Sequence, residues 1–79
     1  MHFDIFTRLE MLDHLIRLKC TGTPRLLARR LSISERSLYN FLELMRSLDA
    51  PIVYCKIRKS YYYAEEGMFN VRFTRRQKP

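Results

Sequence analysis

The sequence predicts an α+β domain in which three helices are followed by a β-hairpin. Its 79 residues leave room for one small core. Apolar residues recur at helical spacing in three successive segments before residue 49. A run rich in β-branched and aromatic residues then follows Pro51 and reaches residue 64. Length and these two patterns together indicate short helices packed beside a small sheet.

The first helix is predicted over residues 4–19, where apolar residues lie at helical spacing. Its apolar stripe consists of Ile5, Leu9, Leu12, Leu15 or Ile16, and Leu18. Asp13 and Arg17 fall on the more polar side, at the i,i+4 spacing that suits an ion pair. Gly22 suits the left-handed conformation that often follows a helix end. We therefore expect residues 20–22 to end this helix.

Two further helices are predicted on either side of a bend near Ser32. Thr23 can cap the second helix, with Pro24 at its first position, and Ser34 can cap a third helix over residues 35–48. The bend is needed because the helical spacing of apolar residues breaks there and then restarts. The residues expected to be buried are Leu27, Leu31, Ile33, Leu38, Leu42, Met45 and Leu48. Two short helices joined by a tight turn form a helix-turn-helix.

A hairpin is predicted after the third helix, because residues 49–51 end that helix. Residues 52–57 and 61–64 are its expected strands, with residues 58–60 at the connection. Strand alternation places Tyr62 on one face and Tyr61 and Tyr63 on the other. The tyrosines admit two interpretations, stacking on the bases of a single strand or packing of the sheet, and we favour packing.

Residues 69–74 alternate as a short strand would, with Phe69, Val71 and Phe73 on one face. The domain is accordingly expected over residues 1–67, with a short strand and a basic tail over residues 68–79. The third helix carries a second apolar stripe, which must be covered. The stripe consists of Phe41, Leu44 and Leu48. We expect the C-terminal strand to cover it, and a second copy of the chain is the alternative.

Basic charge is concentrated in two parts of the chain. The net charge is +7, of which residues 23–48 carry five basic and two acidic groups, and residues 68–79 four basic groups and no acidic group. Such an excess favours a polyanionic partner. Nucleic acid is preferred to a membrane, because the excess is not carried by a long basic amphipathic helix. A solvated basic surface without a ligand is the alternative.

Other classes of function find little support in the sequence. Cys20, Cys55, His2 and His14 show neither metal-ligand spacing nor a disulfide framework, so we expect no metal and no cofactor. A Gly-rich phosphate loop and a nucleophile with an identifiable base are missing, so we do not expect an enzyme. Because the sequence has no membrane-length apolar run and no signal-peptide pattern, a cytoplasmic location and no membrane partner are expected.

Residues 5–64 resemble a known family of DNA-binding domains. The matching segments are Thr23-Pro24-Arg25-Leu26-Leu27-Ala28, Leu31-Ser32-Ile33-Ser34, Arg36-Ser37-Leu38-Tyr39 and Leu48-Asp49-Ala50-Pro51-Ile52. They are similar to the winged helix-turn-helix of bacterial repressors such as the biotin-operon repressor and the deoxyribose-type sugar regulators. Ser32 stands where that family usually has Gly, so we expect the turn to differ slightly in shape. The resemblance implies a regulator of transcription that binds double-stranded DNA.

The resemblance also implies which residues meet DNA. The third helix would enter the major groove and the second would cross the backbone, with the hairpin as a wing. The residues expected to contact bases are Arg36, Ser37, Tyr39 and Asn40. Those expected to contact the backbone are Arg25, Arg29, Arg30, Ser34, Lys56, Arg58 and Lys59. An ordinary solvated helix face is the alternative for the third helix.

A second function remains open at this point. The same fold can serve as a protein-interaction module, with Phe41 and Leu44 as the contact surface for a partner or for a homodimer. DNA binding is the preferred function, because the motif and the charge agree, and the interaction module is the alternative.

Overall fold

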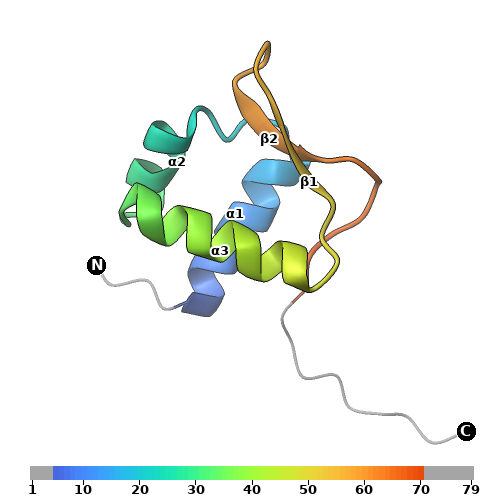
Figure 1. The fold of residues 1–79 in the computed structure, drawn as a ribbon, viewed down its shortest axis with the longest axis horizontal. Coiled ribbons are helices and arrows are strands. Elements are labelled where there is room, and N and C mark those ends of the chain that lie inside the picture. Colours follow the sequence, from blue (N-terminus) through green and yellow to red (C-terminus); the bar gives the residue numbers. More distant parts are fainter. Residues whose placement is uncertain (1–4, 71–79) are drawn as a thin grey trace, which may run out of the picture.

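The computed structural model describes residues 5–70. The chain forms helices α1 (Ile5–Arg17), α2 (Pro24–Arg30) and α3 (Glu35–Ser47), followed by strands β1 (Ile52–Cys55) and β2 (Ser60–Tyr63) (Figure 1). The two strands pair antiparallel. The predicted α+β class and the order of the elements are therefore confirmed.

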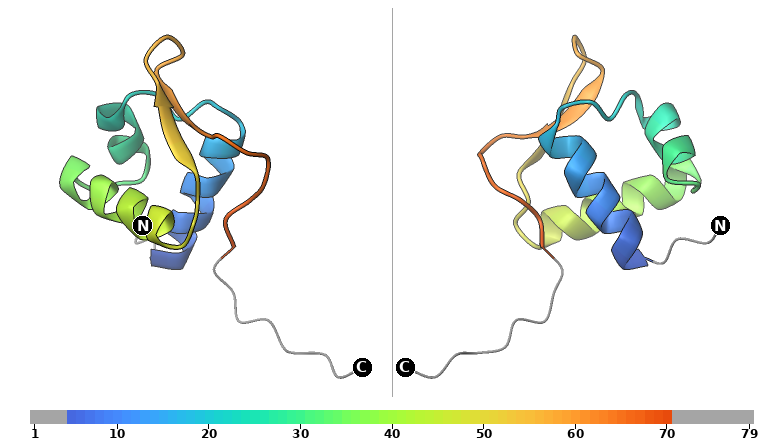
Figure 2. Two further views of the ribbon diagram at one scale, coloured as in Figure 1. Left: turned by 45° about the vertical axis from the view of Figure 1, so that its right-hand side comes forward. Right: turned by 180° about the vertical axis from the view of Figure 1, so that it is seen from behind.

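The core lies between the three helices and the base of the hairpin. Figure 2 shows α1 crossing α3, with the hairpin standing beside both helices. The buried apolar side chains are Leu9, Leu12, Ile16, Leu27, Ala28, Leu31, Leu38, Leu42, Met45, Ile52 and Tyr61. Ile33 is only partly buried, and it packs against this core. The core thus includes most of the apolar positions predicted for the second and third helices.

Side-chain caps begin α2 and α3 as predicted. The hydroxyl of Thr23 accepts a hydrogen bond from the Leu26 amide at 3.4 Å, and Pro24 occupies the first helical position. The hydroxyl of Ser34 accepts from the Ser37 amide at 3.1 Å. Each cap satisfies an amide that the helix itself leaves unpaired.

All three helices end in the same backbone motif, although none of them has Gly at the turn. The residue after the last turn has a positive φ, which is 55° at Lys19, 57° at Ser32 and 73° at Asp49. The next amide then donates to the carbonyl five residues earlier, as in a Schellman motif. These bonds run from Cys20 to Leu15, from Ile33 to Ala28 and from Ala50 to Met45. Ser32 therefore adopts the left-handed conformation that a Gly would supply.

The end of α1 differs from the prediction. The helix stops at Arg17, and the left-handed residue of its terminal motif is Lys19. Gly22 does have a positive φ of 79°, but it lies in the loop before α2. The prediction placed the end too late, because Lys19 takes a conformation that its side chain disfavours.

The position of Leu48 was predicted wrongly. The expected buried face included this residue, yet 58% of it is exposed. Leu48 is the C-cap of α3, with φ −102° and ψ 25°, so it leaves the helical path of Leu38, Leu42 and Met45. Its side chain is thereby turned away from the core.

The first strand is shorter than predicted, and the second begins and ends one residue earlier, because the hairpin turn occupies residues 56–59. Pairing of Cys55 with Ser60 closes the ladder, so Ser60 belongs to β2 rather than to the connection. Tyr61 pairs with Tyr54 and is buried, and the Tyr63 hydroxyl bonds to a residue of α1. Sheet packing therefore accounts for Tyr61 and Tyr63, as the sequence favoured.

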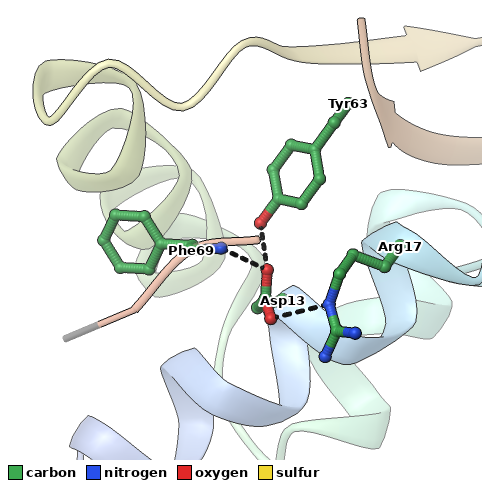
Figure 3. A network of polar contacts seen from close by, with 4 residues as sticks. All are labelled: Asp13, Arg17, Tyr63 and Phe69. Carbon is green, nitrogen blue, oxygen red and sulfur yellow. Dashed lines mark hydrogen bonds and ion pairs between the residues drawn. The ribbon is translucent and has the colours of Figure 1, made fainter. Parts of the chain in front are cut away.

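Asp13 was expected on the polar side of α1, but only 3% of it is exposed. Its carboxylate pairs with the Arg17 guanidinium at 2.9 Å, as the i,i+4 spacing predicted. The same carboxylate also accepts hydrogen bonds from the Tyr63 hydroxyl and the Phe69 amide, each at 2.7 Å (Figure 3). Asp13 thus joins α1 to β2 and to the segment that follows the hairpin.

The second apolar stripe of α3 is only partly buried. Phe69 and Phe41 are partly buried against the core, whereas Leu44 is exposed. Residues 67–70 have no strand structure, in contrast to the strand predicted from residue 69. The remainder of that predicted strand, like the basic tail, lies outside the described residues. Phe69 is held by its amide bond to Asp13 rather than by a sheet.

Glycine at the helix ends should stabilise the domain. A non-Gly residue in the left-handed region costs on the order of 1 kcal/mol. We expect Ser32→Gly and Asp49→Gly each to raise the free energy of unfolding by about 0.5–1 kcal/mol, measured by urea denaturation. His14→Gly, at an exposed position within α1, is the control and should lower it by a similar amount. Loss of stability in both turn variants would contradict the assigned conformation.

Removal of the Asp13 carboxylate should destabilise the fold and release the segment around Phe69. We expect Asp13→Ala to lower the free energy of unfolding by about 3 kcal/mol, because three donors lose a charged acceptor. Hydrogen exchange at the Phe69 amide should also accelerate. Glu10→Ala, at an exposed acid of the same helix, should change stability by less than about 0.5 kcal/mol. Equal effects of the two variants would argue against the role given to Asp13.

Because of the Tyr63–Asp13 hydrogen bond, the free energy of unfolding should fall at alkaline pH. Burial, and then the hydrogen bond to Asp13, raise the pKa of Tyr63 above its ordinary value of 10.0. The unfolded chain therefore ionises this group first, so its contribution to stability is complete below about pH 10 and is lost as the pH rises further. The stability difference between wild type and Tyr63→Phe should be about 2 kcal/mol at about pH 8 and smaller at about pH 11.

The matched control for this pH dependence is Tyr62→Phe, because Tyr62 lies beside Tyr63 and its hydroxyl forms no hydrogen bond within residues 5–70. Urea denaturation at each pH gives the comparison. A Tyr63→Phe difference that stays constant with pH would show that the Tyr63 hydroxyl does not titrate differently in the folded state.

Candidate nucleic-acid interface

Two buried hydroxyls fix the end of β2 next to the hairpin turn to the loop between α1 and α2. Thr21 is fully buried and Ser60 nearly so. The Thr21 amide donates to the Ser60 hydroxyl at 3.0 Å, and the Tyr61 amide donates to the Thr21 hydroxyl at 2.9 Å. Sequence reasoning missed this pair, because a Thr and a Ser 39 residues apart give no local signal. The bonds hold β2 in place relative to α1 and α2.

The other side of the hairpin is joined to α3. The rings of Tyr54 and Tyr61 meet edge to face, with centroids 4.8 Å apart. The Arg46 Nε donates to the Ile52 carbonyl at 3.3 Å, which links α3 to β1. Burial raises the pKa of Tyr61, and the nearby Tyr39 hydroxyl raises it further. The hairpin is therefore tied both to α3 and to the α1–α2 loop.

The N-terminal half of α3 exposes three of the four side chains predicted to contact bases. Arg36 and Asn40 are exposed, and 47% of Tyr39 is exposed. Ser37 is only partly exposed, and its hydroxyl is hydrogen-bonded to that of Ser34 at 3.1 Å. Ser34 and Ser37 thus act first as the cap of α3.

The arginines of α2 are exposed, but they do not have the same surroundings. Arg25 and Arg29 have no hydrogen bond or ion pair within residues 5–70. Arg30 donates from Nη1 to the Cys20 carbonyl at 2.8 Å, so it bridges back to the loop after α1. Arg25 and Arg29 are therefore the side chains of α2 that are free to meet an anion.

The hairpin turn carries three exposed cations and an exposed apolar residue. Lys56, Arg58 and Lys59 form no ion pair in the described part of the chain. Ile57, which sequence reasoning passed over, is 94% exposed. The Arg58 amide donates to Cys55 Sγ at 3.4 Å, and this bond braces the turn.

These groups lie in neighbouring parts of the molecule. In Figure 1, α2 packs beside the N-terminal end of α3, and the hairpin turn rises above the helices. The C-terminal end of α3 and residues 64–70 lie on the other side. The structure thus places the predicted contact residues on three separate elements, away from the C-terminal end of α3.

An open groove of about 460 Å³ lies at that C-terminal end. Leu48 and Met68 contribute exposed apolar surface, and Asp49, Glu65 and Glu66 contribute acidic groups. Carboxylates repel a polyanion, so this groove does not suit nucleic acid.

We also searched residues 5–70 for membrane-spanning helices and for clusters of metal-binding side chains. Between residues 5 and 70, every helix is too short or too polar to cross a bilayer. Within that range, His, Cys, Asp and Glu side chains form no cluster of three that could hold a metal ion.

Comparisons with known proteins do not assign the chain to a family. Protein-family models, curated proteins and solved structures were each compared with it, and none matches. Function is therefore inferred from the positions and charges of the chain's own residues.

Proposed function

We propose that the protein binds double-stranded DNA and regulates transcription. The observation that carries this proposal is the exposed face of α3, where Arg36, Tyr39 and Asn40 lie opposite the buried Leu38 and Leu42. A B-DNA major groove is about 12 Å wide and accommodates one helix. A helix with one face in the core and polar side chains on the other has the form needed to enter it.

In this proposal the chain is a winged helix-turn-helix, with α2 and α3 as the helix-turn-helix and the hairpin as the wing. The order of elements and the left-handed turn at Ser32 agree with this assignment. The resemblance of residues 5–64 to bacterial repressors supports it as well.

The exposed side chains can bind both the base edges and the backbone phosphates of DNA. Arg36 can donate two hydrogen bonds to guanine, and Asn40 can pair with the edge of adenine. Arg25 and Arg29 on α2, like the three cations of the hairpin turn, are free to contact phosphates. Base contacts on α3 would then be flanked by backbone contacts on both sides.

Binding can be tested by fluorescence anisotropy with duplexes selected from a randomised pool at about physiological salt. About six phosphate contacts predict a slope near −5 for log affinity against log salt. Arg36→Ala and Asn40→Ala should reduce the preference for the selected sequence, whereas Arg29→Ala and Lys59→Ala should weaken all sequences alike.

Lys19→Ala is the matched control, because it also removes one exposed positive charge. Lys19 lines a second groove together with Tyr62, Glu65 and Glu66, and it lies on none of the three elements that carry the proposed contacts. It should leave the affinity nearly unchanged. If Lys19→Ala weakened binding as much as Arg29→Ala, the net charge rather than the proposed surface would account for the affinity. If all four interface variants behaved identically, α3 would not read sequence.

A protein-interaction module is the second candidate, and exposed apolar surface favours it. Leu44 and Leu48 lie four residues apart at the C-terminal end of α3, and Leu48 lines the acidic groove. Phe41 contributes little to such a surface, because it packs against the core. Partner binding that Leu44→Gln abolishes, together with no salt-sensitive affinity for duplex DNA, would support this function. An enriched palindrome with half-sites about 10 bp apart would instead indicate a DNA-bound homodimer.

A further inference from the structure

We propose that Ile57 is a wedge that inserts between two adjacent base pairs from the minor groove of duplex DNA. This inference rests on the proposed DNA binding and adds an element to it. Ile57 is 94% exposed, more than any other large apolar residue among residues 5–70. An isoleucine in that position gains nothing from the core of its own domain, so its burial requires a partner.

The residues around Ile57 favour an anionic partner. Lys56 precedes Ile57, and Arg58 and Lys59 follow it. None of these three cations forms an ion pair with a carboxylate within residues 5–70. An apolar side chain between cations matches the minor groove, where stacked base pairs lie between two rows of phosphates.

The hairpin delivers this tip as a fixed unit. The end of β2 next to the turn is held by the Thr21–Ser60 hydrogen bonds, and the Tyr54–Tyr61 contact lies at the adjoining pair of the ladder. The turn itself is braced by Cys55 Sγ. In both views of Figure 2 the turn of the hairpin points away from the helices, and Ile57 within this turn is almost fully exposed.

The dimensions of the minor groove select a single side chain. The groove is about 6 Å wide and 7.5 Å deep, so a two-stranded hairpin cannot enter it, whereas one side chain at the tip can. Pyrimidine–purine steps unstack most easily, so the wedge should prefer TA and CA/TG steps. A bilayer suits this tip less well, because one isoleucine provides less apolar surface than a single acyl chain, which itself binds membranes only marginally.

The test uses a selected duplex with 2-aminopurine at a central TA step, whose fluorescence rises when the base unstacks. Binding of the wild-type protein should raise the fluorescence. Ile57→Gln should abolish that rise and lower the affinity about tenfold, because the apolar burial is lost. The slope of log affinity against log salt should be the same for Ile57→Gln as for the wild type, because the three cations remain.

Val53→Gln is the matched control, because Val53 is also an exposed β-branched residue of the hairpin but lies at its base. It should keep both the rise and the affinity. Circular dichroism checks that each variant is folded.

Three outcomes would overturn the wedge. Equal affinity and fluorescence for wild type and Ile57→Gln would remove it while leaving the proposed DNA binding intact. Absence of any duplex affinity would remove both proposals. Binding to vesicles of phosphatidylserine and phosphatidylcholine that Ile57→Gln abolishes, with the duplex signal unchanged, would assign Ile57 to a lipid surface instead.

Discussion

The carboxylate of Asp13 is the interaction on which the arrangement of the elements depends. Burial of an anion is costly unless donors replace the water that it loses, and here Arg17, Tyr63 and Phe69 supply three hydrogen bonds. These donors belong to α1, to β2 and to the segment after the hairpin. One side chain therefore sets the position of the hairpin against α1 and ties down the chain that leaves it.

The remaining constraints place the hairpin relative to the other helices. The Thr21–Ser60 pair joins the turn end of β2 to the α1–α2 loop, and Arg46 joins β1 to α3. The left-handed residue Ser32 sets the direction in which α3 leaves α2. The exposed face of α3 and the hairpin turn consequently keep a fixed spatial relation, as the proposed binding of one duplex by both elements would require.

Charge is distributed so that one orientation toward a polyanion is favoured. Arg25, Arg29 and the hairpin cations lie without ion pairs in the part of the chain that the structure describes, whereas Asp49, Glu65 and Glu66 gather around the groove at the end of α3. Under the proposed function, a field of this kind would turn these cations toward nucleic acid and the acidic groove away from it.

The sequence by itself determined what depends on near neighbours along the chain. Helical spacing, the caps at Thr23 and Ser34, and the β-rich run after Pro51 predicted the elements and their order, because these signals act within a few residues. The exposed positions of Arg36, Tyr39 and Asn40 followed from the same spacing, whereas their expected role came from the family resemblance. Only the tertiary structure decided that Asp13 is buried and that Leu48 is exposed. Those outcomes depend on partners from distant segments and on where α3 stops, which helical spacing alone does not encode.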